Sequence, residues 1–312
     1  MRFFVIGNSV LSGKRYPALL VLWILLWGLT GCLVRRREKL PASANPAAAP
    51  VRLTASLQEL LEKIKTQQDA IQTLDAIATI EPTVRSPNSG EIVNYRDVRT
   101  FILLRQPAFI RMIGLYPVVQ NTAFDMTSDG EQFRVYIPAK NQFVIGKSQD
   151  NGHRSNSALE NLRPQHILDA LLVKGPEPGK EEAVLEVYSE GSNSDYLIHI
   201  LRTIPGQWPV LARNIWFERR GLSLARLQVF DDNAEEVTDV LYSDYVQSSG
   251  IPYPREIIVE RPKDFYALRL LISNLTLNQQ IDDEKFRLGQ PPGTELKNLD
   301  QQSVSKNEGN GG

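Results

Sequence analysis

The middle of the chain is a succession of short apolar or alternating segments separated by turn residues, and this pattern restricts the fold more than any other feature. About a dozen of these segments have the length and the β-branched or aromatic content of strands. The predicted strands are Asp75–Thr83, Ile92–Leu104, Phe109–Leu115, Gln120–Thr127, Gln132–Ile137, Gln142–Gly146, Ala183–Ser189, Asp195–Thr203, Val210–Arg219, Leu222–Phe230, Glu236–Tyr245, Arg255–Arg261 and Ala267–Leu277. So many strands with short links predict one large antiparallel sheet that curls into a barrel or half-barrel.

Several predicted strands are apolar on both faces, among them Phe101–Leu104 and Leu268–Ile272. A strand of this kind needs apolar cover on both sides, or has one face that lines an apolar cavity. Both alternatives remain open from the pattern alone.

An amphipathic helix precedes the strands. Ser56 can cap its first turn, and Glu59 three residues later completes a capping box. One stripe at helical spacing holds its apolar residues, which are Leu57, Leu60, Leu61, Ile64 and Ile71. We expect this helix to pack on the sheet, although a helix of this kind could also plug a barrel.

A second, shorter helix is predicted where the run of strands is interrupted. Pro164 suits the first helical position and Gly175 the end. Its apolar stripe consists of Ile167, Leu168, Leu171 and Leu172. Such a helix can close a cavity as a lid, or it can simply cover the core, and the pattern favours neither.

The amino terminus has the layout of an export signal. Arg2, Lys14 and Arg15 precede an apolar run from Pro17 to Gly28. The sequence Leu29-Thr30-Gly31-Cys32 follows and resembles the lipobox of bacterial lipoproteins. That resemblance implies cleavage after Gly31 and attachment of lipid, with acyl chains such as palmitate, to Cys32. Cys32 is the only cysteine, so the chain cannot form an internal disulfide.

Two other interpretations of this segment remain. Tyr16–Val34 is just long enough to span a bilayer as an uncleaved anchor, and Arg35–Arg37 follows it at once. It could also be a buried structural segment. The position of the sole cysteine favours the lipoprotein signal.

Composition changes at both ends of the predicted folded part. Pro41–Pro50 contains three prolines and no hydrophobic period, which is typical of an extended tether. Lys297–Gly312 is polar and ends in glycines. We therefore expect a signal peptide over residues 1–31, a lipidated cysteine and tether over 32–52, a half-barrel domain over 53–296 and a disordered tail over 297–312.

Several function classes lack support. The 35 basic and 36 acidic residues nearly balance, so nucleic-acid binding is not expected. No HExxH, GxSxG, P-loop or Gly-rich dinucleotide motif occurs. His153, His166 and His199 are scattered, which predicts no metal site. We expect no cofactor and no catalytic residue; a hydrolase that uses Asp231 and Asp232 is the remaining enzymatic alternative.

Two segments resemble the LolA family of periplasmic lipoprotein carriers. Ser128–Pro138 resembles the family's hairpin, and Ile281–Gly293 resembles its closing strand and Pro-Gly tail. The resemblance implies a mainly β (α+β) fold, in which a curved antiparallel sheet forms an unclosed β-barrel with a helical lid. The apolar concavity of that barrel would take the acyl chains of lipoproteins. The related acceptor LolB is itself an outer-membrane lipoprotein, and Leu33 is not the aspartate that signals retention at the inner membrane.

One position departs from the family. The carriers have an arginine, which fastens the lid, before the proline that matches Pro107; here that residue is Gln106, and Arg105 should face the other side of the sheet. The same alternation predicts the cavity-lining residues Ile102, Leu104, Ile110 and Met112. The predicted lid residues are Gln106, Ile167, Leu168 and Leu171.

These observations predict a non-enzymatic protein of the cell envelope, anchored by lipid and facing the periplasm from the outer membrane. Its expected ligands are acyl chains or lipoproteins. The alternative is a structural or sensing module that binds a protein partner through the half-barrel. The sequence predicts no oligomeric state.

Overall fold

The structure is a computed structural model that describes residues 52–86, 90–148, 163–190 and 193–300. The predicted signal peptide, Cys32 and nearly all of the tether lie outside the described residues, as does the tail beyond Asp300. None of the helices in the described ranges is long and apolar enough to cross a membrane.

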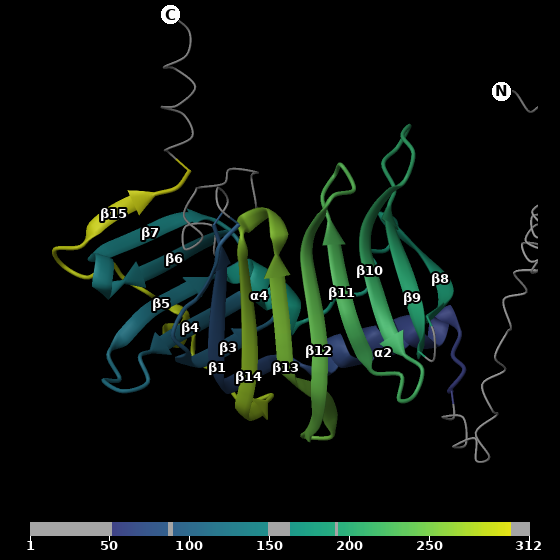
Figure 1. Cartoon of the computed structure of the whole chain (residues 1–312), viewed down its shortest axis with the longest axis horizontal. Coiled ribbons are helices and arrows are strands. Elements are labelled where there is room, and N and C mark those ends of the chain that lie inside the picture. The colour runs from purple at the N-terminus through teal and green to yellow at the C-terminus, as the bar shows by residue number, and fades with distance from the viewer. Residues whose placement is uncertain (1–51, 87–89, 149–162, 191–192, 301–312) are drawn as a thin grey trace, which may run out of the picture. The chain divides into compact units, whose positions relative to one another are not determined.

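One sheet dominates the described part of the chain (Figure 1). The regular helices and strands are α2 (Leu57–Ala70), β1 (Thr73–Arg85), β2 (Ile92–Asn94), β3 (Val98–Arg105), β4 (Phe109–Leu115), β5 (Thr122–Ser128), β6 (Gln132–Ile137), β7 (Gln142–Lys147), α4 (Pro164–Leu171), β8 (Glu181–Glu190), β9 (Asn193–Arg202), β10 (Val210–Glu218), β11 (Leu224–Phe230), β12 (Glu236–Ser248), β13 (Ile251–Arg261), β14 (Tyr266–Leu277) and β15 (Glu295–Asn298). Short 3₁₀ turns are η1 (Pro138–Lys140), η2 (Pro262–Asp264) and η3 (Asp283–Phe286).

The strand order is β15-β7-β6-β5-β4-β3-β1-β14-β13-β12-β11-β10-β9-β8, with β2 paired to β1. Every pairing is antiparallel except that of β15 with β7, which is parallel. The two end strands, β15 and β8, do not pair with each other in the described residues. The prediction of a large curved sheet that stays unclosed is therefore confirmed.

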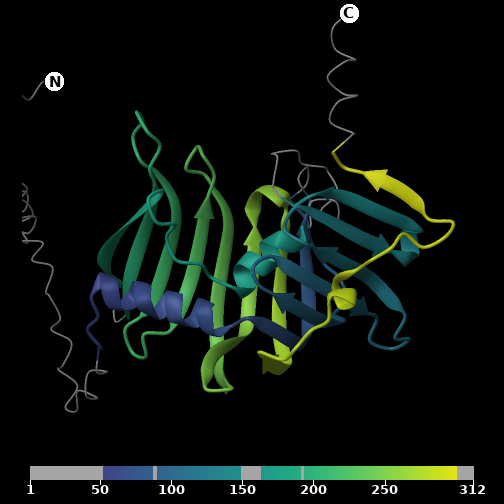
Figure 2. The same ribbon diagram turned by 180° about the vertical axis from the view of Figure 1, so that it is seen from behind.

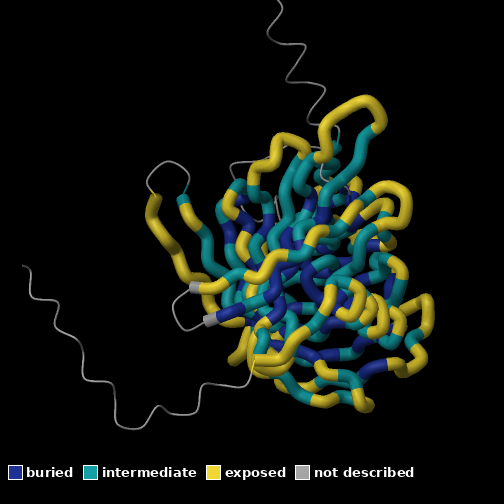
Figure 3. The backbone as a smooth tube through the Cα atoms, turned by 90° about the vertical axis from the view of Figure 1, so that its right-hand side faces the viewer, coloured by how far each residue is buried: buried dark blue, intermediate teal, exposed yellow. Residues whose placement is uncertain are grey.

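Both helices lie on the same side of the sheet, which we call the inner face (Figure 2). Helix α2 contacts β8, and α4 contacts β4, β5 and β13. The buried apolar side chains of the inner face and of both helices form one continuous core. In Figure 3 the buried residues accordingly gather within the curve of the sheet, and exposed residues lie mainly in the connecting loops.

Helix α2 begins as the sequence predicts. The Ser56 side chain accepts a hydrogen bond from the Glu59 amide, and the Glu59 carboxylate accepts one from the Ser56 amide, which completes the capping box. Leu60 and Ile64 of the apolar stripe are buried against the sheet. These local signals were sufficient because a capping box and a helical stripe act within a few turns of chain.

Besides shifts of one or two residues at many strand ends, the structure differs from the predicted strands in two places. Ile92–Leu104 is divided into β2 and β3, because β3 begins only at Val98, where it pairs with Ile80. The hairpin of β12 and β13 is longer than predicted and turns at Ser249 and Gly250, which both have positive φ.

The carboxyl-terminal segment requires two corrections. Ile281–Gly293 contains no strand; its first part forms η3, and the closing strand is β15, farther along the chain. The predicted boundary at residue 296 is also wrong, because β15 continues to Asn298 and the Leu299 amide donates to the carbonyl oxygen of Ile145. Main-chain pairing with β7 orders this polar segment, and composition cannot reveal such pairing.

The segment between β14 and β15 crosses the outer face of β3–β5 (Figure 2). Arg105 donates to the carbonyl oxygen of Ile281 and stacks over the ring of Phe286, which is buried. Arg111 donates to the carbonyl oxygen of Lys285 at 2.8 Å. Arg105 therefore lies on the outer side of the sheet, as the alternation of side chains predicts.

Candidate functional site

The four predicted cavity residues share the inner face. Ile102 pairs with Met112, and Leu104 pairs with Ile110, across β3 and β4. Each is at most 1% exposed, and all four belong to the core that includes α4. Their side chains are thus packed against the protein itself, and contact with a lipid remains a prediction.

The short helix forms where it was predicted, with Pro164 as its first residue. Its apolar side chains Ile167, Leu168 and Leu171 are all buried. The helix ends at Leu171 rather than near Gly175, because the chain leaves helical geometry at Leu172. It covers the inner face; movement as a lid remains a prediction.

Two tyrosines hold the carboxyl end of α4. The Tyr242 hydroxyl donates to the carbonyl oxygen of Ala170 at 2.9 Å, and the Tyr253 hydroxyl donates to that of Leu171 at 2.8 Å. The last carbonyl groups of a helix have no partner within the helix, so these bonds satisfy groups that would otherwise be buried without one. Burial raises the pKa of both tyrosines above the usual value.

The sequence did not single out these two tyrosines, which it predicted only as core or rim residues. Tyr242 and Tyr253 occupy inward positions on strands β12 and β13. A buried phenol requires a hydrogen-bond partner, so an inward tyrosine in a strand indicates that a polar group lies opposite it. The partner could not be identified, because nothing local connects these strands to a helix about 70 to 80 residues away.

Gln106 contacts α2 rather than the predicted lid helix. Its side-chain amide donates to the carbonyl oxygens of Gln68 and Ile71, both at 2.6 Å. Asn278 supports the same helix end, donating to the carbonyl oxygen of Ala70. The assignment of Gln106 to the lid was therefore wrong: the β3–β4 turn lies next to the end of α2, and α4 is held by the tyrosines.

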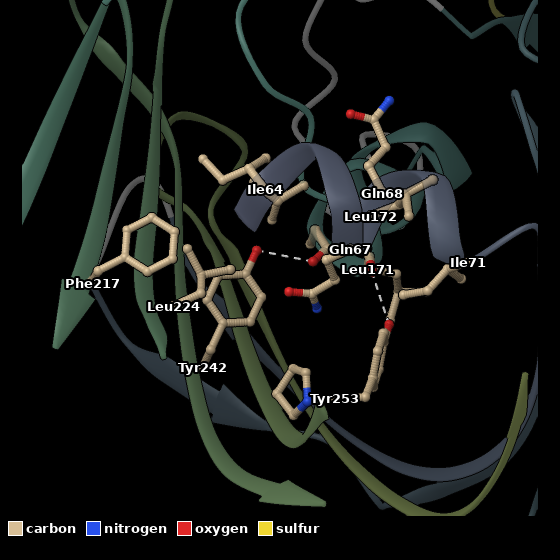
Figure 4. A pocket seen from close by; sticks show the side chains of 13 residues that line it. Ile64, Gln67, Gln68, Ile71, Leu171, Leu172, Phe217, Leu224, Tyr242 and Tyr253 are labelled. Atoms are coloured by element: carbon tan, nitrogen blue, oxygen red, sulfur yellow. Dashed lines mark hydrogen bonds between the residues drawn. The ribbon is translucent and has the colours of Figure 1, made fainter. Parts of the chain in front are cut away.

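A pocket lies where the two helices approach each other (Figure 4). Its cavity volume is small, about 30 Å³, and the rest of the hollow is open to solvent. Its lining is mainly apolar and includes Ile64, Ile71, Leu172 and Phe217, while the polar groups come from Gln67, Gln68 and the two tyrosines. No charged side chain is among the lining residues. Of the predicted lid and cavity residues, only Leu171 lines it.

The lining predicts the kind of ligand that this pocket could take. An apolar pocket with a few polar groups is typical of sites for uncharged or weakly polar small molecules. A charged group would lose its hydration here without gaining a partner of opposite charge. The character of the lining is therefore compatible with an apolar chain whose polar end is uncharged or stays at the mouth, although the space in this conformation is too small to hold one.

The residues considered for catalysis have structural partners. The His199 ring lies between the carboxylate of Glu186, at 2.9 Å, and the side-chain oxygen of Asn214, at 2.8 Å. His166 lies 3.2 Å from the hydroxyl of Tyr266. His153 is outside the described residues.

The acidic pair is also engaged in ion pairs. Asp231 pairs with Lys263 at 2.6 Å, which lowers the pKa of Asp231, and Asp232 pairs with Arg202. Among the residues that the structure describes, no three His, Cys, Asp or Glu side chains gather as a metal site would require.

An exposed apolar tip stands at the turn between β4 and β5. Val118 is 90% exposed and Val119 is 63% exposed. Two adjacent exposed valines form a small apolar surface, and a contact of this tip with protein or membrane is a prediction.

Comparison with known proteins identifies the fold. Neither a protein-family model nor a curated protein matches the sequence. A DUF1329 family protein from Desulfovibrio piger superimposes with a TM-score of 0.50 at 14% identity, over 75% of this chain and 98% of that one. A LolA superfamily protein, NE2245 from Nitrosomonas europaea, gives 0.47 at 14% identity, over 75% and 99% of the two chains. A putative outer membrane lipoprotein-sorting protein domain from Vibrio parahaemolyticus gives 0.48 at 12%, over 73% and 95%. The described domain thus shares the fold of the Desulfovibrio protein, an open curved sheet with helices on its inner face.

Proposed function

We propose that this chain is a non-enzymatic lipoprotein of the bacterial outer membrane, facing the periplasm, that shelters acyl chains or the lipid part of lipoproteins beneath α2 and α4. The observation that carries this proposal is the apolar pocket at the junction of the two helices, which is lined by residues of the continuous core on the inner face. Predicted lipidation of Cys32 places such a site within a tether's length of a membrane.

The structure corresponds in this proposal to the ligand-free, closed form. The inner face is filled by Ile167, Leu168 and Leu171, so an acyl chain must displace α4 as it enters. Each buried methylene contributes roughly 0.8 kcal/mol, so a chain of some 14 carbons supplies about 10 kcal/mol. That is enough to replace the apolar contacts of a two-turn helix and the two tyrosine hydrogen bonds, which are worth about 1 kcal/mol each.

Native mass spectrometry of the full-length chain, extracted in mild detergent, tests this proposal. Co-purified lipid, or competition between a fluorescent palmitate analogue and unlabelled fatty acid, is the expected result. Leu224→Trp should fill the pocket and reduce uptake of the analogue, whereas Leu241→Trp, at a position 41% exposed and outside the pocket lining, should not. A lipid-free spectrum together with no displaceable analogue binding would exclude the function.

A second candidate is an envelope module that binds a protein and takes no lipid. The observation in its favour is the burial of Ile102, Leu104, Ile110 and Met112, each at most 1% exposed within the core that includes α4. The same two variants separate the candidates. If the chain shelters lipid, Leu224→Trp lowers uptake of the fluorescent analogue and Leu241→Trp does not; if it is a protein-binding module, neither variant changes that measurement.

A further inference from the structure

The two edges of the sheet differ in how their strands are paired. At one end β15 pairs with β7 and covers its edge. At the other end β8 pairs with β9 alone among the described strands. An edge strand presents main-chain groups that can pair with another chain, and proteins usually protect or use such an edge.

The register shows which groups of β8 are directed outward. The Thr203 amide donates to the carbonyl oxygen of Lys180, so hydrogen bonds toward β9 recur at alternate residues from there. The amide and carbonyl groups of Ala183, Leu185 and Val187 then point away from β9. They form a row that a further antiparallel strand could pair with.

The side chains of β8 define what that strand should look like. Ala183 and Leu185 pack at the border of the core on the inner face, and Val187, on the same face by alternation, is 53% exposed. A strand added here would bury Val187 and extend the inner face if its own inward residues were apolar. Val184, on the outer face, is 51% exposed.

Charge on the outer face specifies the partner further. Glu182 is exposed, and Glu186 on the same face is 51% exposed although it contacts His199. The strand has no basic residue between Glu181 and Glu190, so a second copy of β8 would bring no cation to these carboxylates. Opposite charges across a strand pair stabilise it, and like charges destabilise it.

We propose that β8 is a docking edge for an extended segment of another protein, which adds to the sheet as an antiparallel strand with apolar residues on the inner side and basic residues four apart on the outer side. This partner site is separate from the lipid pocket, and it does not depend on the proposed function.

The test uses a designed peptide and the full-length chain in detergent micelles. The octapeptide Thr-Lys-Val-Thr-Val-Lys-Val-Thr, capped at both ends, sets its lysines opposite Glu186 and Glu182 and its valines opposite Leu185 and Ala183. Fluorescence anisotropy should show binding about tenfold tighter than that of the matched peptide with glutamate in place of lysine. Hydrogen exchange should show slower exchange of the outward amides of Ala183, Leu185 and Val187.

Variants decide the outcome. Val187→Pro removes an outward amide that β9 does not use, so binding should be lost while Val187→Thr retains it. Glu182→Lys should reduce or invert the preference between the two peptides, and it keeps the test informative if the proline variant does not fold. Equal binding of both peptides, no binding, unchanged exchange in β8, or a β8-mediated dimer of the chain would each overturn the proposal.

Discussion

The Tyr253 hydroxyl donates a hydrogen bond of 2.8 Å to the carbonyl oxygen of Leu171, the last residue of α4. Tyr242 makes the equivalent bond to Ala170. The end of the helix that covers the inner face is thus held to strands β12 and β13 by two buried phenols. These two strands also line the pocket, so closure of α4 and the shape of the pocket depend on the same side chains.

Replacing both phenols should loosen α4 without unfolding the sheet. Tyr242→Phe with Tyr253→Phe leaves two buried carbonyl groups without donors, which should lower the free energy of unfolding by about 1–3 kcal/mol per site. Amide exchange in α4 should become faster, and uptake of a fluorescent palmitate analogue should accelerate. Denaturant unfolding and hydrogen exchange measure these effects.

Tyr245 offers a matched control for this experiment. Its hydroxyl donates to the carbonyl oxygen of Leu224 and not to α4. Tyr245→Phe should lower stability comparably but leave exchange in α4 unchanged. If all three substitutions changed α4 equally, the role assigned to Tyr242 and Tyr253 would be wrong.

Stability should fall at alkaline pH. Burial raises the pKa of Tyr242 and Tyr253 in the folded state, whereas the unfolded chain has tyrosine pKa values of about 10. The unfolded state therefore releases protons above that pH and the folded state holds them, so the stabilisation present below pH 10 is lost as pH rises further. Denaturant unfolding between pH 8 and pH 11.5, roughly the span around that pKa, measures the slope. The double phenylalanine variant should show a smaller slope, and an equal slope would contradict the explanation.

Gln106 should control the end of α2. Gln106→Ala removes the donor to two carbonyl oxygens and should cost about 1–3 kcal/mol of unfolding free energy. Gln106→Glu should cost more, because its carboxylate would face carbonyl oxygens at the negative end of the helix dipole. Raising the pH through the titration of the introduced carboxylate should widen the difference between the two variants. Equal stability of both variants at neutral pH would contradict this role.

Local patterns predicted much of this fold, and contacts distant in sequence account for the rest. Phe109–Leu115 and Gln132–Ile137 were predicted with the bounds that β4 and β6 have, because alternation and turn residues act locally. Ser56 likewise marked the start of α2. The polar strand β15 carries no such pattern and exists because β7 offers a partner edge.

The candidate site shows the same division. Alternation correctly put Ile102 and Met112 on one face, since a strand's period is two. It could not tell whether that face was empty or filled, because the answer depends on how α4 packs. Gln106 was assigned to the wrong helix for the same reason, because tertiary structure decides which helix packs beside the β3–β4 turn.

Lipid attachment at Cys32 has a direct chemical test. Cells grown with an alkyne analogue of palmitate should label the wild-type chain, and mass spectrometry should find Cys32 as the modified amino terminus. Cys32→Ala should abolish both labelling and cleavage, while Thr30→Ala, which keeps a small residue before the cut, should behave as wild type. An unlabelled wild-type protein of full precursor length in the membrane would instead support the uncleaved anchor.

The apolar tip between β4 and β5 should contribute to membrane contact independently of the lipid anchor. Val118→Asp with Val119→Asp places two charges where exposed valines would enter the membrane interface. The favourable free energy of transferring each valine from water to that interface would then be lost. In a form of the chain that begins at Leu33, and so carries neither the lipid nor the uncleaved apolar segment, flotation with phospholipid vesicles should fall severalfold. Val184→Asp, also at an exposed valine but on the edge strand β8, is the matched control and should float as the parent does. Equal flotation of the tip variant and its parent would show that these valines serve a protein contact or none at all.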